Sequence, residues 1–111
     1  DVVSVTEKFA TENPGLLRTF LQVTEEANQN WNASDAQIKK VAADAGMDFS
    51  TTKNQMAGFV FPTIADQKST YFGSDGIAVS AAESLGLVFK KPGAWNVDDK
   101  IANVITGEYL D

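Results

Sequence analysis

An amphipathic helix between residues 13 and 31 dominates the pattern of apolar and polar positions. Asn13 followed by Pro14 predicts its start, because asparagine caps helices and proline suits the first helical turn. One face carries residues spaced three and four apart: Leu17, Phe20, Leu21, Thr24, Ala27 and Trp31. The opposite face is polar and carries Arg18, Gln22, Glu25 and Gln29. Burial of one large apolar side chain contributes about 1.5–3 kcal/mol, so we expect another segment, in this chain or beyond it, to cover the stripe.

The first five residues predict a strand. Asp1–Val5 reads DVVSV, a short β-branched run typical of a buried strand. A lone strand has unpaired N–H and C=O groups on both edges, which other strands must satisfy. The chain is therefore expected either to pair with a copy of itself or to be part of a larger α/β protein, and we favour the second.

Capping signals divide the middle of the chain into short helices. Thr6 is expected to cap a brief helix that ends before the proline. Ser34 and Gln37 form a capping box for a second apolar stripe, which consists of Ile38, Val41, Ala42 and Ala45. Gly46 is the expected stop, with Met47 folding back in a Schellman motif. Ser50 is the predicted cap of the next helix.

The second half of the chain follows the same pattern. Residues 59–62, Phe-Val-Phe-Pro, are closed by proline and predict a buried connector rather than an edge strand. Thr63 is expected to cap one helix and Ser74–Asp75 to begin another, in which Gly86 costs about 1 kcal/mol relative to alanine. Asp98 or Asp99 is expected to begin a last short helix. The prediction is a mainly α fold of five or six helices plus one N-terminal strand.

The net negative charge argues against nucleic-acid binding. The chain has 111 residues and a formal net charge of -6, with a pI near 4.5. Nucleic-acid binding needs clustered cations, and the only basic pairs are Lys39–Lys40 and Lys90–Lys91. We interpret the first pair as part of a solvated helix face and the second as a favourable helix C-terminus. No apolar run approaches the ~20 residues that a membrane-spanning helix needs.

Catalytic chemistry has little support in the sequence. Without histidine or cysteine, the usual base near neutral pH and the common nucleophile–base pairs are missing. The adjacent pair Glu25–Glu26 does not share a helix face, and Asp98–Asp99 fits a helix cap better than an acid–base pair. We expect no enzyme activity, no cofactor and no metal site. Trp31 and Trp95 are interpreted as packing residues, and the sequon Asn32-Ala33-Ser34 as a helix boundary.

The opening of the chain resembles a known family. The strand-like run is followed by Thr6-Glu7-Lys8-Phe9-Ala10, by Glu12-Asn13-Pro14 and by an amphipathic helix through Phe20. This order resembles the C-terminal part of periplasmic substrate-binding proteins of ABC importers, of the taurine, alkanesulfonate and nitrate type. In that family a valine-rich strand precedes a helix pair marked by Lys, Phe, Ala and Pro. Asn13 is a departure, since the family often has histidine there.

The resemblance extends with lower specificity over nearly the whole chain. The later matching positions are Phe61-Pro62-Thr63, Gln67, Tyr71-Phe72-Gly73 and the helix from Asp75. It implies that residues 1–111 form a single unit, a C-terminal fragment that completes the first lobe of a bilobed α/β type II periplasmic-binding-protein fold. The pocket-forming lobe would lie upstream.

Asp1 is the one ligand-binding residue that the resemblance implies. In taurine-type members an aspartate directly before the valine-rich strand pairs with the ammonium group of the ligand, and Asp1 stands at the matching position. Such a charge-assisted contact is stronger than a neutral hydrogen bond. The implied function is capture of taurine or a related sulfonate in the periplasm and its delivery to a membrane permease.

Two alternatives remain open. One is a self-contained helical interaction module that buries its stripes against a partner or a second copy. The other is a fragment of a protein like the thiamine-precursor synthases, which share the bilobed fold but rely on histidine and cysteine. If the importer interpretation holds, the isolated chain should not bind taurine measurably and should self-associate, because the surface that covers its stripes is missing.

Overall fold

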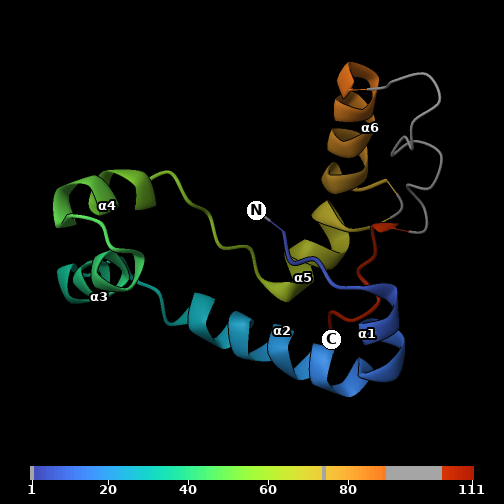
Figure 1. Cartoon of the computed structure of the whole chain (residues 1–111), viewed down its shortest axis with the longest axis horizontal. Coiled ribbons are helices and arrows are strands. Elements are labelled where there is room, and N and C mark those ends of the chain that lie inside the picture. The colour runs from blue at the N-terminus through green and yellow to red at the C-terminus, as the bar shows by residue number, and fades with distance from the viewer. Residues whose placement is uncertain (1, 74, 90–103) are drawn as a thin grey trace.

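The computed structural model describes residues 2–73, 75–89 and 104–111 and is mainly helical in that part (Figure 1). The elements are α1 (Glu7–Glu12), α2 (Pro14–Gln29), α3 (Asp35–Ala45), α4 (Phe49–Met56), α5 (Ile64–Asp66), the π-helical turn η1 (Gln67–Tyr71) and α6 (Ile77–Phe89). The described residues contain six α-helices and no strand, so the predicted helical content is confirmed.

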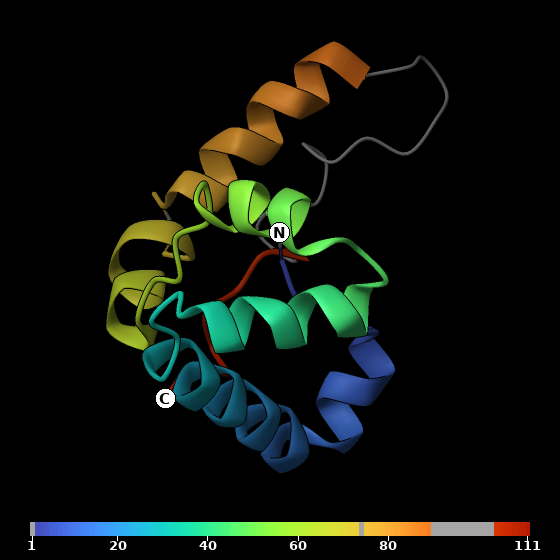
Figure 2. The same cartoon turned by 90° about the vertical axis from the view of Figure 1, so that its left-hand side faces the viewer.

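The helices form an open arc rather than a closed bundle. In Figure 1, α2 runs along the base, α3 and α4 lie at one end, and α1 and α6 lie at the other. Figure 2 shows the arc from the end at which α3 and α4 lie, and Figure 1 shows the segment that follows α4 returning above α2 to α5. The Cα radius of gyration is 16.8 Å, whereas a compact domain of this length has about 13 Å. An arc of this kind leaves much apolar surface uncovered.

The predicted N-terminal strand is wrong. Residues 2–5 have no regular structure, and the side chains of Val2, Val3 and Val5 are 68%, 54% and 45% exposed. A β-branched sequence favours an extended backbone, but a strand exists only where a neighbouring strand accepts its hydrogen bonds. The described part of the chain supplies no such neighbour.

Three predicted helix starts are confirmed by side-chain caps, at Thr6, Ser34 and Thr63. The Thr6 hydroxyl accepts a hydrogen bond from the Phe9 amide at 3.0 Å and caps α1. The Thr63 hydroxyl accepts one from the Asp66 amide at 3.1 Å and caps α5. These hydroxyls satisfy amides that have no partner inside the helix, so local sequence alone fixes both starts.

Helix α3 begins and ends where its sequence predicts. The Ser34 hydroxyl accepts a hydrogen bond from the Gln37 amide at 3.2 Å. At the other end Gly46 adopts a left-handed φ of 67°, and the Met47 amide donates to the Ala42 carbonyl at 2.9 Å. The latter bond is the long hydrogen bond of a Schellman motif.

Two predicted caps are wrong. Asp48, not Ser50, caps α4, because its carboxylate accepts hydrogen bonds from both the amide and the hydroxyl of Thr51, at 2.9 and 2.6 Å. Helix α2 begins at Pro14 as predicted, but the Asn13 side chain makes no capping hydrogen bond. The Asn13 amide instead donates to the Phe9 carbonyl at 2.8 Å and closes α1.

Several other boundaries differ from the predictions. Helix α2 ends at Gln29, before the predicted Trp31, and α6 begins at Ile77, later than the predicted start at Ser74–Asp75. Helix α6 runs to Phe89, so Gly86 does not end it. Residues 59–62 form the predicted connector, but it is not buried, since Val60 is 80% exposed. The predictions for Lys90–Lys91, Trp95 and Asp98–Asp99 lie outside the described residues.

The core of the described part is small. Five apolar residues are buried, namely Ala10, Leu17, Ile38, Ala42 and Leu110, together with the polar Thr52. Many large apolar side chains are more than one-third exposed, among them Leu16, Phe20, Val23, Phe59, Val60, Ile77, Leu85, Leu87, Val88 and Phe89. The packing that the described residues provide therefore covers only part of the apolar surface that the sequence encodes.

Helix α2 is rotated relative to its predicted stripe. Leu17 is buried as predicted, but Phe20 is 54% exposed. The partly covered side of the helix includes two residues predicted to be solvated, Arg18 and Glu25. Leu16 and Val23 lie beside Phe20 on the exposed side, each 60% accessible. The contacts of Arg18 and Glu25 explain this rotation.

Candidate functional site

The predicted ligand-binding residue, Asp1, lies outside the described residues. The segment that follows it, residues 2–5, is exposed and has no regular structure. A ligand-binding role for Asp1 remains a prediction. The described side chains instead converge at three places along α2.

The first convergence is centred on Arg18, near the start of α2. Its Nε donates to the Asp111 carboxylate at 3.0 Å, and its Nη2 donates to the Glu108 carbonyl at 3.4 Å. The guanidinium carbon lies 5.1 Å from the centre of the Tyr109 ring. One arginine therefore contacts three residues that lie about 90 positions away in the sequence.

The contacts of Arg18 make both favourable and unfavourable contributions to stability. The ion pair is partly exposed, with side-chain accessibilities of 34% and 51%, and a pair of this kind contributes about 0–1 kcal/mol. A cation–π contact adds about 0.5–1 kcal/mol. Arg18 Nη1 is buried and has no hydrogen-bond partner among the described residues, which costs about 1–3 kcal/mol. The polar contacts alone are therefore close to balance, and burial of Leu110 adds the apolar contribution.

The second convergence joins α2 to α5 through Glu25. The Glu25 carboxylate accepts a hydrogen bond from the Ile64 amide at 2.9 Å, and another from the Gln29 side chain at 2.8 Å. It thereby satisfies a free amide in the first turn of α5. The sequence places Glu25 on the polar face and contains no signal for this contact, because its partner lies 39 residues away.

The third convergence is aromatic and lies at the end of α2. The Trp31 ring meets the Phe61 ring edge-on, with centroids 6.1 Å apart, and Phe61 meets Phe59 at 6.3 Å. This arrangement confirms the predicted packing role of Trp31. Phe59 remains 52% exposed, so the cluster is open on one side.

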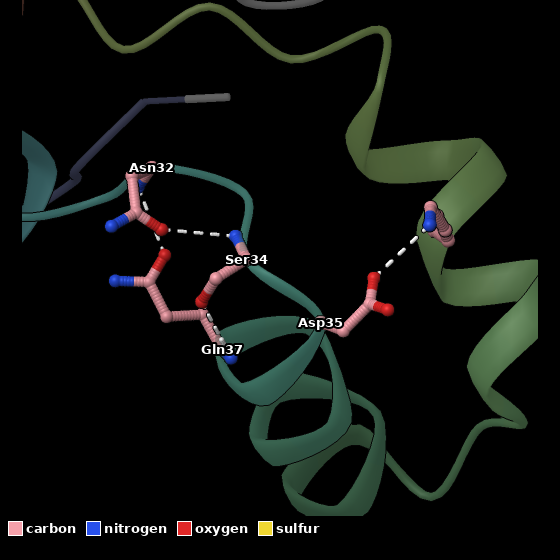
Figure 3. A network of polar contacts seen from close by, with 5 residues as sticks. Asn32, Ser34, Asp35 and Gln37 are labelled. Atoms are coloured by element: carbon pink, nitrogen blue, oxygen red, sulfur yellow. Dashed lines mark hydrogen bonds and ion pairs between the residues drawn. The ribbon is translucent and has the colours of Figure 1, made fainter.

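The sequon residues form part of a helix boundary, as predicted. The Asn32 side-chain oxygen accepts a hydrogen bond from the Ser34 amide at 3.0 Å, and the Asn32 amide donates to the Gln37 side chain at 2.9 Å (Figure 3). Gln37 also donates to the Asn30 carbonyl at 2.8 Å. Beside this network Asp35 pairs with Lys53 at 3.0 Å and ties α3 to α4. These contacts all serve the turn and the adjoining helices.

The described residues gather no cluster of three or more acidic, histidine or cysteine side chains suited to a metal ion. A shallow, open depression on α1 is lined by Glu7, Lys8, Thr11 and Glu12.

Two hydrogen bonds from Thr51 lower the pKa of the Asp48 carboxyl group, the one from the hydroxyl having the larger effect and the one from the amide the smaller. This group is the cap of α4, so its shift has a structural cause.

Within the described ranges, no helix is both long enough and apolar enough to cross a bilayer. The chain was compared with protein families, with curated proteins and with solved structures, and none of them matches it.

Proposed function

We propose that this chain is part of the solute-binding component of an ABC importer, which captures taurine or a related sulfonate in the periplasm and delivers it to a membrane permease. The observation that carries the proposal is the order of residues at the start of the chain. Lys8-Phe9-Ala10 and Pro14 stand between a valine-rich run and an amphipathic helix, as in that family. No catalytic role is proposed.

Two features of the described residues support the proposal. Val2, Val3 and Val5 are exposed although their sequence suits a buried strand, and the sheet of a larger protein would give them neighbours. The exposed residues of α2 and α6 likewise need a cover that a larger lobe would supply. Helices of this kind form the outer layers of an α/β lobe.

Solute capture by such a protein requires no covalent bond to be made or broken. Two lobes close around the solute, and contacts with both lobes favour the closed state. This chain would contribute helices to one lobe and, through Asp1, one carboxylate at the rim of the cleft. That carboxylate would distinguish an aminosulfonate from a sulfonate without an amine.

The proposal is tested on the intact protein by calorimetry with taurine and with propanesulfonate, which has no ammonium group. Asp1→Ala is expected to weaken taurine binding about tenfold to a hundredfold and to leave propanesulfonate binding unchanged, because only taurine loses a charged partner. Asp44→Ala, which removes an exposed carboxylate of α3, is the matched control and should change neither affinity. If neither sulfonate binds the unaltered intact protein, the proposed function is wrong.

A second function, a helical interaction module, is favoured by one specific observation. Leu16, Phe20 and Val23 lie at i, i+4 and i+7 on the exposed side of α2, and each is at least 54% accessible. This spacing is typical of helices that bind in an apolar groove. A chain that stays monomeric in light scattering and melts cooperatively would favour the module, whereas self-association together with sulfonate binding by the intact protein would favour the importer.

A further inference from the structure

Residues 106–111 lie across the first half of α2 and form a segment that we call the strap. In Figure 1 the strap is the red end of the chain, which descends beside α1 and α2. Leu110 is 6% exposed and Leu17, next to Arg18 on α2, is 4% exposed. A Cβ atom added at Gly107 would lie 3.4 Å from the Phe72 Cβ, so the strap also passes close to the residue that follows η1.

Polar contacts between the strap and α2 all involve one side chain. Arg18 pairs with Asp111, donates to the Glu108 carbonyl and stacks on the Tyr109 ring. The strap's own backbone adds only local bonds, from the Glu108 amide to the Thr106 hydroxyl at 3.0 Å and from the Leu110 amide to the Gly107 carbonyl at 3.1 Å. Loss of the arginine would therefore remove every polar tie between the two elements that the described residues make.

We propose that the strap is a reversible cover over α2 that Arg18 holds closed and that ionic strength opens. Two observations make closure weakly favoured rather than permanent. The Arg18–Asp111 pair is partly exposed and is therefore screened by salt. Closure also buries the Nη1 donor without a partner, and opening returns that donor to water.

Opening has a defined structural consequence. It exposes Leu110, which is 6% accessible in the closed state, and frees the side of α2 that carries Arg18, next to the exposed Leu16 and Phe20. The position of the strap therefore determines how much of the surface of α2 is accessible for binding. This inference concerns contacts within the chain and holds whichever solute or partner the protein recognises.

Hydrogen–deuterium exchange of the full chain tests the proposal. The amides of Glu108 and Leu110 report on the strap, and residues 35–56 report on the integrity of the fold. Arg18→Met retains most of the side-chain length but removes the charge, and should accelerate exchange of the two strap amides about threefold to tenfold. Lys53→Met breaks the comparable exposed pair with Asp35 and should leave the strap unchanged.

The salt dependence of strap exchange distinguishes an Arg18 that holds the strap through its charge from an Arg18 that only packs against it. At about 1 M salt, where the Debye length is about 3 Å, strap exchange in the unaltered chain should rise toward that of Arg18→Met, and the variant should respond little. Equal strap exchange in the two proteins at low salt would overturn the proposal. If Arg18→Met also accelerates exchange in residues 35–56, the variant Asp111→Asn provides the test, because it removes only the ion pair. Unchanged strap exchange in Asp111→Asn would then overturn the proposal.

Discussion

The α3–α4 pair and helix α6 lie at opposite ends of the arc and differ in how their apolar residues are covered (Figure 1). Helix α3 packs against α4, and Ile38, Ala42 and Thr52 between them are no more than 4% exposed. In α6 the large residues Ile77, Leu85, Leu87, Val88 and Phe89 are all at least 51% exposed. The α3–α4 pair buries a small core of its own, whereas the large apolar side chains of α6 remain uncovered.

The reason lies in the two sequences. Residues 34–58 contain two capping residues, Ser34 and Asp48, and a glycine stop at Gly46. They also carry one apolar stripe that a neighbour only a few residues away can bury. Helix α6 is apolar over most of its surface, which is typical of a helix that is surrounded by protein. A helix of that kind cannot be covered by one short neighbour.

The largest expected effect is loss of the small core between α3 and α4. Ile38→Ala should destabilise this pair by about 2–4 kcal/mol, because the isoleucine is 2% exposed and its removal leaves a cavity. Exchange protection of residues 35–56 measures the change. Ile77→Ala in α6, where the side chain is 51% exposed, is the matched control and should cost far less. Equal effects at the two sites would contradict the comparison.

Self-association through α6 is the next largest effect. The chain is expected to associate with increasing concentration, and the double variant Leu85→Gln, Val88→Gln should weaken association about tenfold, since two exposed apolar side chains are lost. Sedimentation equilibrium measures the shift. Replacing the exposed Lys39 and Lys40 of α3 by Gln should leave association nearly unchanged. An unaltered chain that stays monomeric over the same concentrations would contradict this prediction.

Replacing glycine by alanine should have opposite effects on stability at Gly46, which ends α3, and at Gly15, which lies in α2. Gly46→Ala is expected to cost about 1 kcal/mol, because φ is 67° there and a Cβ disfavours the left-handed region. Gly15 lies in α2 with no atom within 4 Å of an added Cβ, so Gly15→Ala should instead stabilise slightly. Thermal unfolding followed by circular dichroism measures both, and a common sign would contradict the assignment of Gly46 as the helix stop.

The smallest expected effect is the pH dependence of α4. Because hydrogen bonds from Thr51 lower the pKa of Asp48 in the folded state, folding favours the ionised carboxyl group. Its contribution is therefore present above the unfolded-state pKa of about 4 and is lost as the pH falls through the lowered folded-state value. Exchange of the Thr51 amide between pH 6 and pH 3, corrected for intrinsic rates, measures the loss. Asp48→Asn should remove this pH dependence without abolishing the cap.

Local chemistry made much of the fold predictable. The starts of α1, α3 and α5 were predictable because a threonine or serine hydroxyl meets an amide three residues later. Asp48 was missed as the cap of α4 because Ser50 offers the same chemistry two residues later, and only the observed hydrogen bonds choose between them. The ambiguity arises because several residue types cap helices almost equally well.

Long-range contacts made the rest unpredictable. Neither the rotation of α2 nor the role of Glu25 follows from periodicity, since both depend on residues 39 to about 90 positions away. The N-terminal strand was wrong for the same reason, because β propensity does not supply a partner. The predicted ligand residue, Asp1, lies outside the described part, so the candidate site rests on the resemblance at the start of the chain.

The sequence by itself determined the helices, because caps, glycine stops and apolar spacing act within a few residues and need no distant partner. Only the tertiary structure decided which face of α2 is covered, because Arg18 and Glu25 gain partners there and Phe20 does not. The physical difference is how far apart in the sequence the interacting residues are. Helix hydrogen bonds close over four residues, whereas the burial of a face depends on whatever surface the fold brings against it.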